Sequence, residues 1–127
     1  MATPQLIAVV DDEPDVRDAF QRLLRAAGFN VETYGSGMDF LETLPDRTPD
    51  CLVLDLQMPE MTGFDVQMNL GQMSLSIPTI ILTGNDSTEA HTKALANGAF
   101  SYLTKPAEQV DLLGAVNAAI ASAQRVH

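Results

Sequence analysis

The sequence is poor in the residues that indicate a disulfide scaffold, a zinc centre or a nucleic-acid-binding surface. It has one cysteine, Cys51, so an intramolecular disulfide cannot form and no cysteine–histidine cluster can hold zinc. Its 7 Lys and Arg residues stand against 17 Asp and Glu residues, which gives a net charge of −10. Because nucleic-acid backbones are held by cationic side chains, we expect no direct nucleic-acid binding by this chain.

Long apolar runs are also missing. No stretch approaches the roughly 20 apolar residues that span a bilayer, so we expect no membrane insertion. The N-terminus lacks the basic segment and cleavage site of a signal peptide, which favours the cytoplasm. A length of 127 residues predicts a single domain, 1–127, with a folded core of about residues 5–122. Residues 121–127 are expected to fray or to begin a linker.

Short β-rich runs alternate with segments of helical periodicity along the chain. Strands are expected at Leu6–Val10, Val31–Tyr34, Cys51–Leu54, Thr79–Leu82 and Phe100–Leu103, with helices at about 16–27, 38–44, 64–73, 90–97 and 110–120. The first, third and fourth strands are almost entirely apolar, which is typical of a parallel sheet covered by helices on both faces. We therefore predict an α/β fold of the (βα)5 type. Its doubly wound, five-stranded parallel sheet should have the order 2-1-3-4-5.

Several residues are suited to the ends of the expected helices. Pro14 fits a first helical turn, because its missing N–H is not needed there. Ser36 and Asp86 are each followed by an acid three residues later, which predicts two N-caps. Gly28 and Gly98 stand where a left-handed residue commonly ends a helix.

Polar residues follow four of the expected strands. These residues are Asp11 and Asp12 after the first strand, Asp55 after the third, Thr83 after the fourth and Lys105 after the fifth. In a sheet of this kind the site lies at the carboxyl ends of the strands, so these side chains should converge. Three neighbouring carboxylates repel one another unless cations offset their charge. Lys105 supplies one positive charge, and an oxygen-only donor set favours Mg²⁺ or Mn²⁺ over zinc.

Each of these residues also has a plain structural explanation. Asp55 could form a turn, and Asp11 and Asp12 could favour the positive end of a helix. Thr83 could bond to the backbone, and Lys105 could be a solvated cation. The functional interpretation is favoured because all of them fall at one edge of one sheet with complementary chemistry.

Four segments carry a resemblance to a known family. They are Val10-Asp11-Asp12-Glu13-Pro14, residues 52–63 (LVLDLQMPEMTG), residues 78–84 (PTIILTG) and residues 94–106, which end in Tyr-Leu-Thr-Lys-Pro. In this order they resemble response-regulator receiver domains, the CheY-like family of two-component signalling, over essentially the whole chain. The amino-acid sequences of the later segments are most similar to the FixJ-type branch. The resemblance implies the flavodoxin-like, CheY-like version of the predicted fold.

The resemblance also implies a reaction and a metal site. Asp55 would accept a phosphoryl group from a phosphohistidine of a sensor histidine kinase. Mg²⁺, with Mn²⁺ as the alternative, would be held by the Asp12 and Asp55 side chains, by the Gln57 backbone carbonyl and by Asp11 through water. Gln57 and Asn85 would tune how fast water removes the phosphoryl group.

Further positions of the resemblance concern the response to phosphorylation. Lys105 and Thr83 would contact the phosphoryl group, and Tyr102 would be an aromatic switch that turns inward when Thr83 moves. The Lys105–Pro106 peptide bond is expected to be cis. The fourth helix, fifth strand and fifth helix would form the surface for a homodimer or an effector protein. The candidate residues on this surface are His91, Lys93, Leu95, Ser101 and Tyr102.

The expected protein phosphorylates and dephosphorylates itself and is not a turnover enzyme. One alternative is a degenerate receiver that acts as an unphosphorylated scaffold. Another is a Mg-dependent aspartyl-phosphate phosphatase, which needs a second Asp where Gln57 stands. A flavodoxin-like FMN binder is disfavoured because the acidic run after the first strand would repel phosphate. The chain is either a stand-alone regulator or the receiver part of a longer DNA-binding protein, and both readings stay open.

Overall fold

The computed structural model describes residues 4–124, in which five strands alternate with five helices. In chain order the elements are β1 (Leu6–Val10), α1 (Pro14–Ala26), β2 (Asn30–Tyr34), α2 (Gly37–Leu41), β3 (Cys51–Asp55), α3 (Gly63–Gln72), β4 (Thr79–Thr83), α4 (Thr88–Ala96), β5 (Ser101–Thr104) and α5 (Gln109–Gln124). All strand pairs are parallel and the sheet order is β2-β1-β3-β4-β5, which confirms the predicted fold. Residues 121–124 continue α5, and residues 125–127 lie outside the described part.

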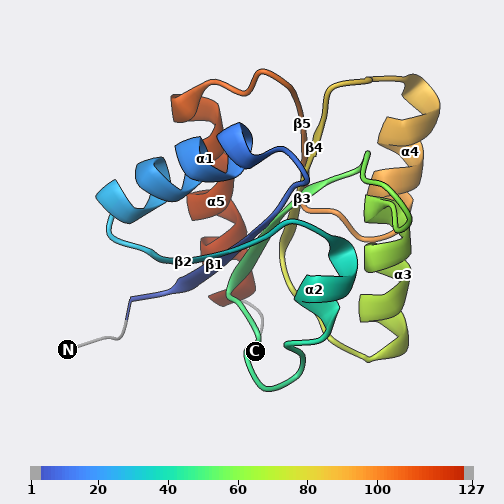
Figure 1. The fold of residues 1–127 in the computed structure, drawn as a ribbon, viewed down its shortest axis with the longest axis horizontal. Helices are drawn as coiled ribbons and strands as arrows, with labels where there is room; N and C mark the ends of the chain where they lie inside the picture. The colour runs from blue at the N-terminus through green and yellow to red at the C-terminus, as the bar shows by residue number, and fades with distance from the viewer. Residues whose placement is uncertain (1–3, 125–127) are drawn as a thin grey trace.

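Helices cover both faces of the sheet. Figure 1 shows α1 and α5 on one side and α2, α3 and α4 on the other. Because successive strand residues point to opposite faces, neighbours along a strand enter different cores. Val9 and Val53 pack in the core beneath α1 and α5. Val10, Leu54 and Ile81 pack in the core beneath the other three helices.

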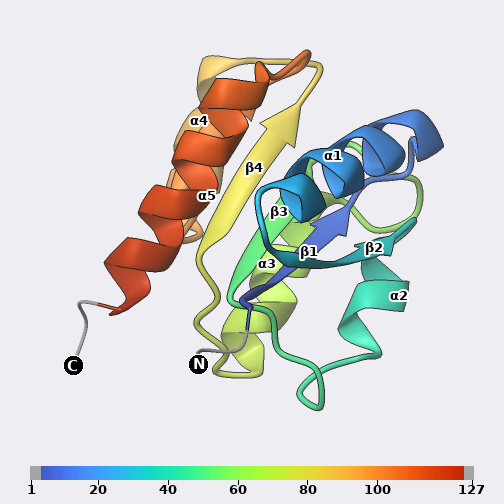
Figure 2. The same ribbon diagram turned by 90° about the vertical axis from the view of Figure 1, so that its left-hand side faces the viewer.

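All five strands run in the same direction, so their carboxyl ends meet at one edge of the sheet. Figure 2 shows the arrowheads of β1, β2 and β4 directed toward the same side of the molecule. This edge is where the sequence predicted the polar residues to gather. Within residues 4–124, no helix combines the length and apolar character of a bilayer span.

The observed helix ends agree with the sequence-based predictions at four positions and contradict one of them. Pro14 begins α1, and Ser36 caps α2 through a hydrogen bond from the Asp39 N–H. Gly28 and Gly98 have φ values of 98° and 99°, the left-handed conformation expected at the ends of α1 and α4.

The predicted N-cap at Asp86 is wrong. The cap of α4 is the next residue, Ser87, whose Oγ accepts a hydrogen bond from the Ala90 N–H at 3.0 Å. The Asp86 carboxylate instead accepts a hydrogen bond from the Tyr102 hydroxyl at 3.0 Å. Either residue can cap a helix, and the tyrosine from β5 decides between them because it offers Asp86 a different donor.

A close backbone approach fixes the turn between β3 and α3. A Cβ atom placed on Gly63 would lie 2.6 Å from the Asp55 carbonyl oxygen and 2.9 Å from the Leu56 Cα. The Gly63 N–H also donates to the Leu56 carbonyl at 3.0 Å. The first residue of α3 therefore has to be glycine if Asp55 is to keep its position at the end of β3.

We expect Gly63→Ala to lower the free energy of unfolding by about 2 kcal/mol or more, because rigid backbone atoms must move apart. Gly71→Ala, in the same helix with open space around it, is the matched control. It should raise stability by about 0.5–1 kcal/mol, since alanine favours the helix. Urea unfolding followed by circular dichroism measures both. Equal stability of the two variants would contradict the steric explanation.

Candidate functional site

The strand registers bring the predicted polar residues together. The residues just before Asp11 and Asp55 are direct partners across β1 and β3, so these two acids lie side by side at the sheet edge. Thr83 ends β4 and pairs with Thr104 of β5, the residue before Lys105. The carboxyl edge of the sheet therefore carries two acids, a hydroxyl and an ammonium group on four strands.

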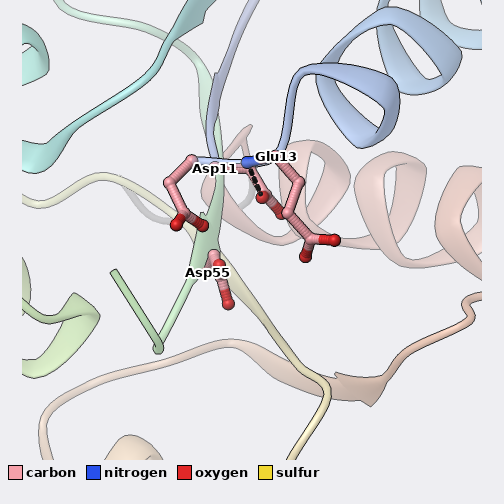
Figure 3. A group of neighbouring side chains, drawn as sticks. Asp11, Glu13 and Asp55 are labelled. Carbon is pink, nitrogen blue, oxygen red and sulfur yellow. Dashed lines mark hydrogen bonds between the residues drawn. The ribbon is translucent and has the colours of Figure 1, made fainter. Parts of the chain in front are cut away.

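Four carboxylates form a cluster at this edge. Asp11, Asp12, Glu13 and Asp55 each place one oxygen so that all four atoms lie within 4.8 Å of one another. Asp11 and Asp55 are only 1% and 2% exposed. Figure 3 shows Asp11, Glu13 and Asp55 grouped where β1 and β3 end and α1 is about to begin. Burial of like charges at this separation is unfavourable without positive charge nearby.

Lys105 supplies that positive charge. Its Nζ lies 2.7 Å from Glu13 Oε1, 2.9 Å from Asp11 Oδ2 and 3.5 Å from Asp55 Oδ2. Burial by itself lowers the pKa of Lys105, but the hydrogen bond to Glu13 and the charges of Asp11 and Asp55 outweigh it and hold that pKa above its ordinary value. The ammonium group is therefore fully charged at neutral pH.

Asp55 has an unusually high pKa for an aspartate. The pKa of its carboxyl is raised from 3.8 to about 6, chiefly by burial and in smaller part by the neighbouring Asp11 charge. The Gln57 N–H, which donates to Asp55 Oδ1 at 3.1 Å, and the Lys105 ammonium act in the opposite direction. Without a metal ion, the ionised carboxylate of Asp55 is poorly solvated, and any added positive charge nearby would stabilise it.

The loop before α1 is held by hydrogen bonds that the sequence analysis did not identify. The Glu13 N–H donates to Asp11 Oδ1 at 2.9 Å, the dashed line in Figure 3. Arg17, in the first turns of α1, donates a hydrogen bond from its Nη1 to the Asp11 carbonyl oxygen at 2.6 Å. Together these bonds fix Asp11. Glu13 was named from the sequence only as part of the segment after the first strand, and its ion pair with Lys105 was missed because the two residues lie 92 positions apart.

The residues expected to respond to phosphorylation lie on the neighbouring strands β4 and β5. Thr83 is fully buried, and its Oγ1 accepts a hydrogen bond from the Asn85 N–H at 3.1 Å. Tyr102 is half-buried and donates its hydroxyl to Asp86 at 3.0 Å. Its ring stacks on His91 with centroids 4.5 Å apart. Burial and the Asp86 carboxylate raise the pKa of Tyr102, so its hydroxyl keeps its proton.

The remaining predicted positions lie around this centre. Gln57 and Asn85 are exposed on the turns that follow β3 and β4. The peptide bond between Lys105 and Pro106 is cis. Of the residues predicted for the surface of α4 and β5, Lys93 also contacts α3, because its Nζ lies 4.4 Å from the centre of the Phe64 ring.

The donor set at the edge fits a hard divalent cation. All of the clustered side-chain donors are carboxylate oxygens, the ligands that Mg²⁺ and Mn²⁺ prefer. Asp11 Oδ2 is buried and accepts no hydrogen bond of good geometry within the described residues, although the Lys105 ammonium lies near it. Asp12 is only partly buried, so a cation there could keep several water ligands.

Comparison with known proteins gives one consistent family. The sequence model of the family described as the response regulator receiver domain matches residues 7–117. The chain is 37% identical over 115 residues to the response regulator protein TmoT of Ectopseudomonas mendocina, covering 91% of this chain and 52% of TmoT. It is 34% identical over 117 residues to the transcriptional regulatory protein FixJ of Rhizobium meliloti, covering 92% of this chain and 57% of FixJ.

A solved structure agrees with these relatives. The crystal structure of FixJ-N superposes with a TM-score of 0.87 at 32% identity and covers 94% of this chain and 96% of that one. The chain spans only about half the length of the curated relatives it matches, 52% of TmoT and 57% of FixJ.

The raised pKa of Asp55 predicts a pH-dependent effect of Asp55→Asn in EDTA. The neutral carboxyl favours the folded state below about pH 4, and this contribution is lost as the pH rises through about 6. The neutral amide avoids that loss. Asp55→Asn should therefore stabilise the protein by about 2–3 kcal/mol more at pH 8 than at pH 4.

Urea unfolding at both pH values measures the effect. Asp18→Asn, which removes an exposed acid from α1, is the control and should show no such difference. If Asp55→Asn has the same effect at pH 4 and pH 8, ionised Asp55 does not destabilise the fold.

Proposed function

This chain belongs to the response regulator receiver domain family, and we propose that it forms one receiver domain that accepts a phosphoryl group on Asp55. The donor is a phosphohistidine of a sensor histidine kinase, and the cytoplasm is the expected compartment. The observation that carries the proposal is the position of Asp55. It is a buried carboxylate with a raised pKa at the carboxyl edge of the sheet, beside Asp11 and 3.5 Å from the Lys105 ammonium.

The transfer is a displacement at phosphorus. A carboxylate oxygen of Asp55 attacks the phosphorus atom, the P–N bond to the histidine breaks, and the imidazole nitrogen keeps the electron pair and takes a proton from solvent. Lys105 offsets the negative charge of the phosphoryl oxygens, and the Gln57 N–H fixes one oxygen of Asp55. The protein mainly orients the two reactants and supplies charge that is already in place.

The carboxylate cluster provides the metal site of the proposal. The Asp12 and Asp55 side chains and the Gln57 backbone carbonyl would hold Mg²⁺, or Mn²⁺, with Asp11 acting through water. When bound, the ion neutralises negative charge on the cluster and on the phosphoryl oxygens. Asp11 is suited to hold a water ligand, because its carboxylate is fixed at the edge by the Glu13 N–H.

Phosphorylation then changes the hydrogen bonds around β4 and β5. The new group adds about −1.5 to −2 charge and three strong acceptors. Thr83 turns its hydroxyl toward the phosphoryl group, and Tyr102 leaves Asp86 and turns inward. A change from a mostly resting to a mostly active population needs roughly 5 kcal/mol of differential interaction. New charge-assisted bonds from Thr83 and Lys105, about 1.5–3 kcal/mol each, are of that order.

The output of the switch is a change in the surface formed by α4, β5 and α5. We propose that this surface binds a second copy of the chain or an effector protein. Water later attacks the phosphorus and Asp55 leaves as a carboxylate, at a rate tuned by Gln57 and Asn85. The similar proteins are response regulators and transcriptional regulators, so a turnover phosphatase is not favoured.

Incubation with acetyl phosphate tests the phosphoacceptor. Intact mass should show one added phosphoryl group that requires Mg²⁺ and is absent from Asp55→Asn, because the neutral amide of asparagine cannot replace the carboxylate that attacks phosphorus. Asp18→Asn should be labelled like the wild type. Full labelling of Asp55→Asn would overturn the assignment. A wild type that neither labels nor binds beryllofluoride, a stable phosphoryl mimic, would favour the unphosphorylated scaffold.

Tyrosine fluorescence tests the switch, because the chain has no Trp and only two Tyr residues. In Tyr34→Phe protein, Tyr102 is the remaining tyrosine. Beryllofluoride with Mg²⁺ should change its emission, since its bond to Asp86 and its stack on His91 are lost. Adding Thr83→Ala should remove the emission change while Asp55 still accepts a phosphoryl group. An unchanged response in the Thr83 variant would exclude coupling through this hydroxyl.

A further inference from the structure

The Lys105 ammonium lies closer to Glu13 and Asp11 than to the proposed phosphoacceptor, Asp55. Within the described residues, the hydrogen bond of good geometry that Lys105 donates goes to Glu13 Oε1 at 2.7 Å. Its distance to Asp55 Oδ2 is 3.5 Å, long for a charged hydrogen bond. In the resting protein, Glu13 therefore competes with Asp55 for the cation that the proposed reaction uses.

The two acids that hold Lys105 differ in freedom. Asp11 is buried and fixed by the Glu13 N–H at one oxygen and by Arg17 at its carbonyl. The Glu13 side chain is 59% exposed. Glu13 and Lys105 both line a hollow of about 520 Å³ between α1 and the segment after β5. Glu13 can thus release Lys105 and turn into solvent, whereas Asp11 stays in place.

We propose that Glu13 is a positioning residue that holds Lys105 away from Asp55 in the resting state and so weakens binding of a phosphoryl group at Asp55. This inference rests on the proposed function. A phosphoryl group on Asp55 draws the ammonium toward its own oxygens, and the bond from Lys105 to Glu13 has to be given up. The bond from Lys105 to Glu13 stabilises the resting state, and its free energy has to be given up when Asp55 is phosphorylated.

The variant Glu13→Gln removes the charge that attracts Lys105 and leaves the local backbone intact. The hydrogen bond to Asp11 comes from the Glu13 backbone N–H, so the amide side chain does not affect it. Glutamine has almost the same shape as glutamate. The acidic loop should therefore keep its conformation while the strongest competitor for Lys105 is weakened.

Asp15→Asn is the matched control. Asp15 is an exposed acid two residues further along, and it lines the same hollow. It forms no ion pair with Lys105 in the described part of the chain. Both variants remove one negative charge near the site, so the long-range repulsion of an anionic ligand falls similarly in each. A difference between them reports the direct contact between Glu13 and Lys105.

The experiment measures the apparent affinity for beryllofluoride at saturating Mg²⁺, by Tyr102 emission in Tyr34→Phe protein. Glu13→Gln should bind about three- to fivefold more tightly than Asp15→Asn, the range expected for a partly exposed ion pair. A separate Mg²⁺ titration without the mimic should give similar Mg²⁺ affinities for the two variants. This second titration tests whether Glu13 binds the metal, because its carboxylate belongs to the same cluster.

Equal beryllofluoride affinities in the two variants would overturn the inference, and so would weaker binding by Glu13→Gln. A loss of Mg²⁺ affinity of tenfold or more in Glu13→Gln alone would also overturn it and would make Glu13 a metal ligand. If Tyr34→Phe protein with the native Glu13 binds no mimic at all, the proposed function itself fails. If that protein binds and the two variants are alike, only the role of Glu13 fails.

Discussion

The structure of this site depends on the burial of two carboxylates at neighbouring strand ends. Asp11 and Asp55 are both almost fully buried and lie next to each other in the sheet register. Their mutual repulsion and poor solvation are offset by one ammonium group, that of Lys105. The raised pKa of Asp55 shows that the offset is incomplete. Added positive charge at this edge would therefore relieve part of the unfavourable free energy of burying the two carboxylates.

The fold creates this arrangement through backbone geometry and through residues that would take no part in the reaction. Parallel strands end at one edge, so residues distant in the sequence become neighbours there. Gly63 lets α3 begin directly behind Asp55, where any larger residue would press on the Asp55 backbone. Arg17 and the Glu13 N–H hold the loop that carries Asp11. These contacts keep the charged groups close, and Glu13 is the exposed acid of the cluster.

The same edge connects to the surface that would carry the signal. Thr83 lies at the end of β4, and the turn after it leads through Asp86 to the start of α4. Tyr102 on β5 links these parts, because its hydroxyl bonds to Asp86 while its ring stacks on His91 of α4. A change in the bonds of Thr83 thus has a short path to both α4 and β5. These contacts hold the half-buried Tyr102 against Asp86 and α4.

The sequence by itself determined the order of the elements, the parallel sheet and which residues stand at the strand ends, because these follow from local patterns. Apolar runs identify buried strands, and Asp55, Thr83 and Lys105 are found simply by where those runs stop. It also suggested a family, which the comparison confirmed. Only the tertiary structure decided which polar groups pair with one another. Glu13 with Lys105, Tyr102 with Asp86 and Lys93 over Phe64 join residues from different elements. Each of these side chains has several suitable partners in the sequence, and the choice among them depends on distances that exist only after the sheet and its helices have packed.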